Sequence, residues 1–296
     1  MARRPHTGPD GIAVVDKEAG WTSHDVVAKA RGLLGTRKVG HSGTLDPDAT
    51  GVLVLGVGAG TRLLRFLEAE TKQYDGVIAF GVETATLDAS GEITATHDMS
   101  GLDPAAVRAA AAGFVGPIMQ IPPMVSAIKI DGRRLHQLAR EGIEVERPPR
   151  PVIIHSFEVS PTADPLRWRA SVRCSAGTYI RTLAADLGSV LDGGAHLASL
   201  RRTAVGRFGL DTAMPLEQIS VQPLVSAIPE GRRLDVDESV IAAIRTGRVF
   251  ESEDLPAVGD GPWWAVDGEQ VIAVLERHPD GRRIKPSVVL AMPTAG

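Results

Sequence analysis

The polar segment GHSGTLDPDATG, residues 40–51, is followed directly by the continuous apolar run Val52–Val57. An unbroken apolar run of this length is typical of a strand that is buried on both faces. The three glycines of the segment permit positive φ or a close backbone approach, and Pro47 disfavours the helical region for Asp46. We therefore expect Asp46 to lie on a stiff loop beside a buried strand. Such a loop either presents a catalytic carboxylate or forms an ordinary Asx-Pro turn.

The composition predicts a globular protein with one large domain, or with one large and one small domain. The 296 residues are 43% apolar, which supports a substantial core. The single cysteine, Cys174, has no partner for an internal disulfide or a CxxC zinc pair. No apolar targeting segment follows Arg3 and Arg4, and no apolar run approaches the length that crosses a membrane. We expect a cytoplasmic protein that does not enter a membrane.

Charge is distributed unevenly along the chain, although the formal net charge is only −4. Residues 167–207 contain seven arginines and two aspartates, whereas residues 208–260 contain four arginines and ten acids. A basic stretch in an acidic chain is expected of a protein that binds a phosphate backbone. Arginine outnumbers lysine 26 to 6 in the whole chain, so codon usage is an alternative explanation for the basic stretch.

Hydrophobic periodicity predicts a mixed α+β architecture. Residues 167–174 alternate, so that Trp168, Ala170, Val172 and Cys174 share one face of an expected strand. We expect further strands at Val14–Val15 and Val52–Val57, helices capped by Ser23, Thr61 and Asp103, and helices over residues 133–140 and 180–191. Asp131-Gly132 predicts a tight turn, and residues 147–151 predict a stiff extended connector.

The pattern changes near Pro229, where short elements replace longer ones. Asp237 is expected to cap a helix that ends at Gly247. Three short apolar segments follow and are separated by Asp-Gly turns, namely Trp263–Val266, Val271–Leu275 and Ser287–Ala291. Short strands with turns of this kind predict a small β-barrel at the C-terminus.

Five motifs of the sequence resemble those of the TruB family of tRNA pseudouridine synthases. Residues 40–51 resemble the family's aspartate motif, and IAVVDKEAGWTS at 12–23 resembles its lysine motif. The segment TKQY at 71–74 resembles its tyrosine motif, CSAGTYIRTL at 174–183 its arginine motif, and HLASLRR at 196–202 its leucine motif. The five motifs occur in the family's order and span roughly residues 12–207, so chance agreement is very improbable.

The resemblance implies both a fold and a reaction. The expected fold is an α+β catalytic domain with a mixed antiparallel sheet at residues 1–228, followed by a PUA-like β-barrel domain that binds RNA at residues 229–296. The implied enzyme is an isomerase, an intramolecular transferase that converts the T-loop uridine at tRNA position 55 to pseudouridine. Cutting N1–C1′, turning the uracil and joining C5 to C1′ involves no redox step, so no cofactor or metal is required. The implied partner is the T-arm of tRNA, and a monomer is expected to need no protein or guide RNA.

The resemblance also implies roles for individual residues. Asp46 matches the nucleophile, Arg181 the arginine that pairs with it and lowers its pKa, and Tyr74 a ring that stacks on the base and assists removal of the C5 proton. The expected substrate-binding residues are His41, Tyr74, Tyr179, Leu200 and Lys17. Of these, His41 fills the space left when the base flips out, and Lys17 supports the pocket. Asp48 lies where the family is not expected to require an acid.

Several alternatives remain open at this level. One is a noncatalytic protein of the same fold that binds or folds tRNA, although such a protein needs no trio of Asp46, Tyr74 and Arg181. Another is a glycosidase that uses Asp46 and Asp48, which an extended backbone would point to opposite faces. A relative that depends on a guide RNA is a third. The GVGAG segment at 56–60 lacks the spacing of a dinucleotide loop, and the histidines lack the spacing of a zinc site.

Overall fold

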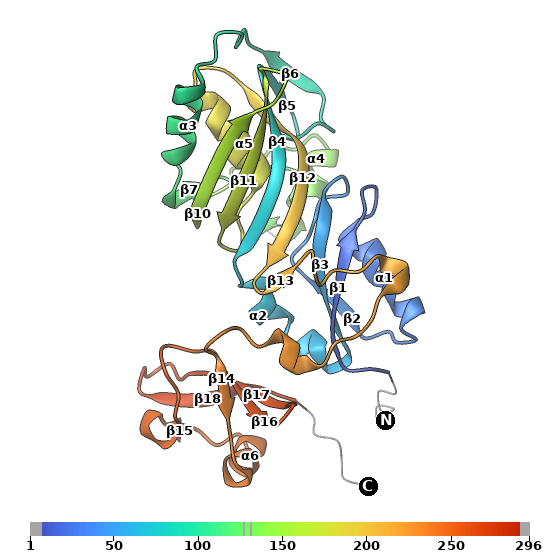
Figure 1. The fold of residues 1–296 in the computed structure, drawn as a ribbon, viewed down its shortest axis with the longest axis vertical. Coiled ribbons are helices and arrows are strands. Elements are labelled where there is room, and N and C mark those ends of the chain that lie inside the picture. The colour runs from blue at the N-terminus through green and yellow to red at the C-terminus, as the bar shows by residue number, and fades with distance from the viewer. Residues whose placement is uncertain (1–7, 127, 131, 291–296) are drawn as a thin grey trace.

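A computed structural model describes residues 8–290 of the chain, except residues 127 and 131. It contains a nine-stranded sheet, which forms the upper body in Figure 1, and a five-stranded sheet that lies below it, beyond helix α2 (Leu64–Glu68). The predicted mixed α+β class is confirmed. Within the described residues, no helix is long and apolar enough to cross a membrane.

The nine-stranded sheet has the order β1-β3-β12-β4-β11-β10-β7, with β2 paired to β3 and β13 paired to β12. Its strands are β1 (Gly11–Lys17), β2 (Val39–Ser42), β3 (Thr50–Val57), β4 (Lys72–Phe80), β7 (Gly116–Gln120), β10 (Arg150–Pro161), β11 (Arg167–Cys174), β12 (Ala195–Val205) and β13 (Phe208–Gly209). Only the pairing of β12 with β3 is parallel among these strands. Strand β12 therefore lies between β3 and β4 and joins two groups of strands.

Helices α3 (Pro104–Ala112) and α5 (Ile180–Val190) cover one face of this sheet, and α1 (Ser23–Leu33) packs beside β2. The alternation predicted for β11 is confirmed, because Trp168, Ala170, Val172 and Cys174 are all buried in the core beneath the two helices. Asp103 caps α3 through the backbone N–H groups of Ala105 and Ala106, as predicted.

Two predicted caps are wrong, for different reasons. Thr22, not Ser23, caps α1, because its hydroxyl forms a reciprocal capping box with Asp25. Ser23 is buried and bonds to Leu45 instead. Thr61 does not begin a helix, since it lies inside a short 3₁₀ turn over Gly58–Arg62 and donates to the carbonyl of Gly58.

The glycines of the GVGAG segment serve backbone packing. A Cβ on Gly60 would lie 2.1 Å from the carbonyl oxygen of Gly11, and one on Gly56 would lie 2.6 Å from that of Gly60. Both distances are far below van der Waals contact, so only glycine allows β3, the following turn and β1 to approach this closely.

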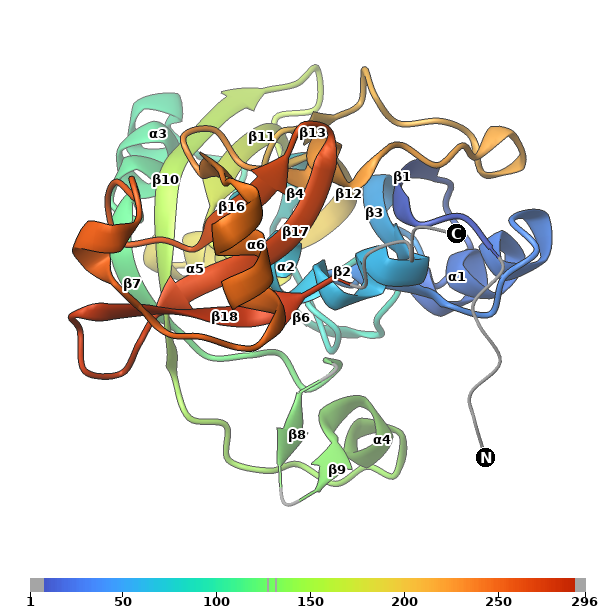
Figure 2. The same cartoon turned by 90° about the horizontal axis from the view of Figure 1, so that it is seen from below.

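Two hairpins project from the nine-stranded sheet. One consists of β5 (Val82–Thr84) and β6 (Ile93–Thr96). Figure 2 shows the other, which consists of β8 (Lys129–Ile130) and β9 (Arg133–Arg134) and leads into α4 (Leu135–Arg140). The second agrees with the predicted turn, although Asp131 lies outside the described residues. The helix expected over 133–140 begins two residues later, and the connector expected at 147–151 ends in β10, which starts at Arg150.

The five-stranded sheet has the order β14-β16-β17-β18-β15 and carries helix α6 (Glu238–Arg245), which Asp237 caps as predicted. Its strands are β14 (Arg233–Asp235), β15 (Phe250–Glu251), β16 (Trp263–Asp267), β17 (Gln270–Arg277) and β18 (Arg283–Val289). The last strand begins earlier than predicted, and Ala291 lies outside the described residues.

One apolar cluster joins the two sheets. It contains Val54 and Phe66 from the first part of the chain and Trp264 and Val271 from the last part. The rings of Phe66 and Trp264 meet edge to face, with their centroids 6.1 Å apart. The five-stranded sheet is therefore packed against the α2 end of the larger sheet rather than tethered by a bare linker (Figure 1).

Candidate active site

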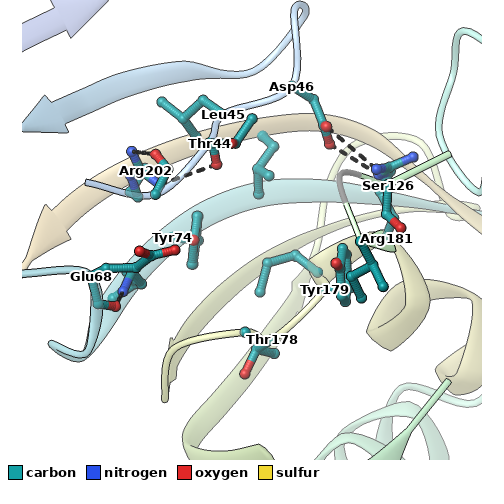
Figure 3. Close-up of a pocket in the computed structure, with 16 residues that line it drawn as sticks. Thr44, Leu45, Asp46, Glu68, Tyr74, Ser126, Thr178, Tyr179, Arg181 and Arg202 are labelled. Atoms are coloured by element: carbon teal, nitrogen blue, oxygen red, sulfur yellow. Dashed lines mark hydrogen bonds and ion pairs between the residues drawn. The ribbon is translucent and has the colours of Figure 1, made fainter. Parts of the chain in front are cut away.

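A cavity of about 340 Å³ lies between the loop before β3, strand β4 and the first turn of α5 (Figure 3). Five of the residues predicted from the sequence line it, namely Asp46, Tyr74, Tyr179, Arg181 and Leu200. These residues come from four separate motifs, so the fold brings distant segments to one cavity. Lys17 and His41 are not among the residues of its wall.

Asp46 and Arg181 form a two-pronged ion pair at the edge of this cavity. Arg181 Nε lies 3.0 Å from Asp46 Oδ2, and Arg181 Nη2 lies 3.3 Å from Asp46 Oδ1. Arg181 is buried, whereas 43% of the Asp46 side chain remains accessible from the cavity. Two parallel hydrogen bonds hold the carboxylate in one orientation, and the positive charge of the guanidinium pairs with its negative charge. The pairing predicted from the sequence is therefore present.

Opposing influences act on the pKa of Asp46. Burial raises it above its ordinary value, and the nearby Asp88 carboxylate acts in the same direction, whereas the Arg181 guanidinium lowers it. Arg181 lowers the pKa as expected, but burial outweighs it, so the net shift is upward. Arg181 thus opposes the effect of burial and favours the ionised form of the carboxylate.

Asp88 is a site residue that the sequence did not reveal. Its Oδ2 lies 3.4 Å from Arg181 Nη1, and its Oδ1 accepts hydrogen bonds from the hydroxyls of Thr86 and Ser90 at 2.5 and 2.6 Å. Arg181 also donates to the carbonyls of Thr86 and Val125, at 3.0 and 2.8 Å. The guanidinium is therefore held on several sides, so it presents its remaining edge to Asp46. No motif or spacing connects Asp88 with Arg181.

Lys17 holds the loop from behind. Its ammonium donates to the carbonyls of Glu18, Trp21 and Pro47 at 2.9, 2.6 and 2.9 Å, and only 1% of the residue is exposed. Burial lowers the pKa of Lys17 to about 8. Because Pro47 follows Asp46 directly, these bonds fix the backbone that carries the carboxylate. This geometry fits the pocket support that was expected of Lys17 and not direct contact with a ligand.

Arg202 fixes the other side of the same loop. It is 1% exposed and donates to the carbonyls of Val52 and Gly43 at 2.7 and 3.1 Å. The backbones of β3 and β12 also approach each other closely here. A Cβ on Gly51, where φ is +101°, would lie 2.1 Å from the carbonyl oxygen of Arg202. Arg202 ends the leucine motif, but nothing in that motif indicated that its side chain would reach back to residue 43.

The two tyrosines occupy different positions in the cavity. Tyr74 is 8% exposed and pairs in register with Arg202 across β4 and β12. Burial raises the pKa of Tyr74, which Arg202 partly opposes, so the phenol is neutral near pH 7. Tyr179 precedes α5, and its backbone N–H and C=O both bond to the side-chain amide of Gln120, at 2.7 and 3.0 Å. Its ring is thus held at the entrance of the helix.

His41 lies on β2, where it pairs in register with Leu55. Its ring meets that of His24 edge to face, with a centroid distance of 5.3 Å. Burial lowers the pKa of His41 to about 4, and the nearby His24 and Arg202 act in the same direction. The fold places His41 two residues before the first residue of the cavity wall, so its predicted role in filling the flipped-out space stays a prediction.

The backbone around Asp46 forms a turn on the loop before β3, and Asp46 lies outside any helix as expected. The N–H of Ala49 donates to the carbonyl of Asp46 at 3.1 Å, which brings residues 46–49 into a tight turn. Asp48 does not line the cavity that holds Tyr74. In that cavity the close partner of Asp46 is the arginine of α5, an arrangement that does not resemble a pair of glycosidase carboxyls. Among the described residues, no cluster of metal-binding side chains is present.

Comparison with known proteins agrees with this geometry. Residues 31–180 match the model of the TruB family pseudouridylate synthase N-terminal domain, and residues 181–228 match that of the tRNA pseudouridylate synthase B C-terminal domain. The tRNA pseudouridine synthase B of Streptomyces griseus is 46% identical over 93% of this chain and 96% of that protein. The protein of the same name from Corynebacterium glutamicum strain R is 52% identical over 86% of this chain and 84% of that protein.

Solved structures share the fold at lower sequence identity. The match from a crystal structure of a Cbf5-Nop10-Gar1 complex has a TM-score of 0.70 at 23% identity and covers 96% of this chain and 84% of that one. A second match, from an H/ACA RNP bound to a substrate RNA containing 2′-deoxyuridine, has a TM-score of 0.69 at 21% identity and covers 95% and 85%. With the Asp46–Arg181 pair in the cavity beside the nine-stranded sheet, and with relatives that match along most of its length, this chain belongs to the TruB family of pseudouridine synthases.

Proposed function

We propose that this protein is a tRNA pseudouridine synthase that isomerises a uridine of the T-loop, at tRNA position 55. The observation that carries the proposal is the two-pronged Asp46–Arg181 pair at the edge of a cavity walled by Tyr74, Tyr179 and Leu200. The tRNA pseudouridine synthase B proteins to which the chain is similar along most of its length support the same conclusion. A noncatalytic binding protein would have no need of a buried arginine that holds a carboxylate ionised.

The proposed mechanism begins with removal of the target base from its stack. A loop uridine has to be flipped out before its sugar and base edge become accessible, and the cavity of about 340 Å³ receives the base against Tyr74. Asp46 then acts as the nucleophile that permits cleavage of the N1–C1′ bond. Arg181 supplies positive charge that opposes the effect of burial and favours the ionised carboxylate.

The released uracil then turns and forms the C5–C1′ bond, after which the proton on C5 is lost. We propose that Tyr74 assists this step as a phenolate: its hydroxyl first gives its proton to solvent, Arg202 stabilises the negative charge on the phenol oxygen, and that oxygen then takes the proton from C5. The buried walls exclude water that would otherwise capture the electron-poor sugar. Every step is an exchange of bonds within one nucleotide, so the reaction calls for no redox group.

We propose that the T-arm of tRNA is bound by this chain as a cytoplasmic monomer, with no protein partner and no guide RNA. The excess of arginine in residues 167–207 supports binding of a phosphate backbone. Arg173, an exposed residue of β11, and Arg207 both line a second depression beside Glu70 and Glu230. Phosphate binding of this kind predicts an affinity that falls steeply as salt is added.

We further propose that residues 1–228 carry the reaction and that residues 229–296 form a PUA-like domain that binds RNA. The larger sheet ends at Gly209 and the smaller sheet begins at Arg233, which supports a boundary between them. A chain truncated after Ile228 is expected to modify an isolated T-arm stem-loop but to bind full-length tRNA less tightly. It is also expected to be less stable, because truncation exposes Phe66. A truncated chain that is well folded by circular dichroism but inactive would contradict this division.

The direct test of the function is tritium release from 5-tritiated uridine in a T-arm stem-loop, with purified protein and nothing else added. The expected result is release of one tritium per stem-loop, with pseudouridine recovered from the RNA. A stem-loop that carries cytidine in place of the target uridine is the control. Accumulation of free uracil, or full dependence on an added RNA or protein, would contradict the proposal.

A further inference from the structure

A second cavity, of about 270 Å³, adjoins the first at the Asp46–Arg181 pair. Asp46, Arg181 and Leu200 line both cavities. The second cavity is bounded by the turn at residues 46–49, by the loop at residues 86–90 and by β12. A molecule bound in the first cavity therefore has a neighbouring space directly beside it, across Leu200.

The second cavity contains a carboxylate that the proposed reaction does not use. Asp48 lines this cavity and is exposed, and within the described part of the chain no group hydrogen-bonds to its side chain. Asp88, in contrast, is held by Arg181, Thr86 and Ser90. Ala89 and Leu87 bond to the backbone of Leu197 at 3.1 and 3.0 Å, which fixes this loop on β12. The walls are thus preformed, and the acceptor oxygens of Asp48 are free to meet a ligand.

The chemistry of the ligand follows from the proposed function, on which this inference rests. The substrate is a polynucleotide, so a nucleotide adjacent to the target uridine is held beside it by the covalent chain. The second cavity is only slightly smaller than the first, and so it admits a base of the same size class as uracil. Proteins read the unstacked bases of RNA loops through hydrogen bonds to their edges.

We propose that this cavity binds the base of a nucleotide adjacent to the target uridine, and that Asp48 selects a base with an exocyclic amine, such as cytosine. A carboxylate accepts a hydrogen bond from the N4 amine of cytosine. Uracil presents O4 at the same place, so two acceptors would face each other, which disfavours binding. A phosphate is a poor ligand here for the same reason, because it would approach Asp48 and Asp88. Asp48 is thus a specificity residue and not a participant in the chemistry at the target sugar.

The test compares stem-loop RNAs that carry cytosine or uracil at each position adjacent to the target uridine, with the wild type and with Asp48→Ala. Both turnover at limiting substrate and the affinity of the RNA, by fluorescence anisotropy, are measured. Asp75→Ala is the matched control, because Asp75 is an exposed acid of β4 that lines a neighbouring third cavity but not the second, whereas Asp48 lines both. Both substitutions remove one negative charge and so change the overall attraction of RNA alike. The role of the cavity is therefore judged from the ratio of turnover, and of affinity, between the cytosine RNA and the uracil RNA.

At one adjacent position the wild type is expected to prefer cytosine about tenfold, as for one hydrogen bond to a charged group. Asp48→Ala is expected to reduce this ratio to about twofold or less, while Asp75→Ala leaves it unchanged. Since both enzymes meet the same RNAs, effects of the base on the RNA's own folding cancel. Retention of the ratio in Asp48→Ala, its loss in Asp75→Ala, or its absence from the wild type would overturn the inference. A wild type that makes no pseudouridine contradicts the proposed function, whereas the affinity ratios still decide the role of Asp48.

Discussion

The two sheets of this protein use charge in opposite ways. In the nine-stranded sheet and its loops, Lys17, Lys72, Arg181 and Arg202 are each at most 5% exposed. In the described part of the five-stranded region, residues 229–290, no charged residue is buried. Its ion pairs, such as Arg233–Asp235 and Arg283–Asp280, lie at the surface. The smaller sheet instead has an apolar interior built around Trp263 and Ile272.

This difference shows that the fold accepts a cost in stability around the candidate active site. A buried charge costs several kcal/mol of desolvation unless good partners offset it, whereas a surface ion pair contributes about 0–1 kcal/mol. Lys17 and Arg202 hold backbone carbonyls of the loop that carries Asp46, and Arg181 holds Asp46 itself. Substitution of a charged residue should therefore be severe near the cavity and mild in the smaller sheet.

The largest contrast is expected between Asp46→Asn and Asp235→Asn. Loss of the nucleophile should reduce turnover by at least about 10⁴-fold, while the affinity for RNA stays within a few-fold because phosphate contacts dominate binding. Asp235 pairs with Arg233 on the surface, so its substitution should leave turnover unchanged. Tritium release and RNA affinity are measured for both variants. Turnover near the wild-type rate in Asp46→Asn would remove Asp46 from the chemistry.

The next contrast is between Arg181→Met and Arg233→Met. Without Arg181, the already raised pKa of Asp46 rises further, because burial and Asp88 are then opposed only by the smaller effect of Lys17. Turnover at pH 7 should fall by at least about 10²–10³-fold, as when one preorganised charge partner is removed from an active site. The residual activity should increase with pH as Asp46 ionises. A pH profile identical to that of the wild type would show that Arg181 does not control the carboxylate.

A smaller effect, on stability, is expected for Lys17→Met compared with Lys285→Met. Removal of the Lys17 ammonium takes one donor from each of the carbonyls of Glu18, Trp21 and Pro47, and the free energy of unfolding should fall by about 1–3 kcal/mol. The burial that lowers the pKa of Lys17 offsets part of this loss. Lys285 is a partly exposed residue of β18, and its substitution should change the free energy of unfolding by less than about 0.5 kcal/mol. Equal urea midpoints for the two variants would contradict the contrast.

The smallest effect concerns the pH dependence of folding. The pKa of His41 is about 4 in the folded chain, below its ordinary value of 6.5. Between these two pH values the unfolded chain binds more protons, so the free energy of unfolding rises with pH and falls on acidification through this window. The slope from one group is at most about 1.4 kcal/mol per pH unit, and the partial exposure of His41 makes it smaller. His41→Asn should flatten urea-derived stability between pH 5 and 6.5, and an unchanged slope would refute this assignment.

The sequence predicted the features that depend on neighbouring residues. The alternation of β11 and the caps Asp103 and Asp237 follow from local periodicity and hydrogen bonding, and the structure confirms them. The Asp46–Arg181 pair was predicted only through resemblance, since 135 residues separate the two. Asp88 and Arg202 were missed because their contacts exist only after distant strands pair. The cap of α1 was predicted wrongly for the same reason, because the Ser23 hydroxyl forms a tertiary hydrogen bond with Leu45.

The position of β12 has a consequence for the order in which the protein is made. Strands β1, β2 and β3 come from the first 57 residues, and β4, β7, β10 and β11 come from residues 72–174, but the two groups meet only through β12 at 195–205. A growing chain therefore carries two open sheet edges until that strand leaves the ribosome. Asp46 belongs to the first group and Tyr74 to the second, so no nascent chain shorter than about this length assembles the cavity. Non-local pairing of this kind slows folding and leaves unpaired edges open to aggregation.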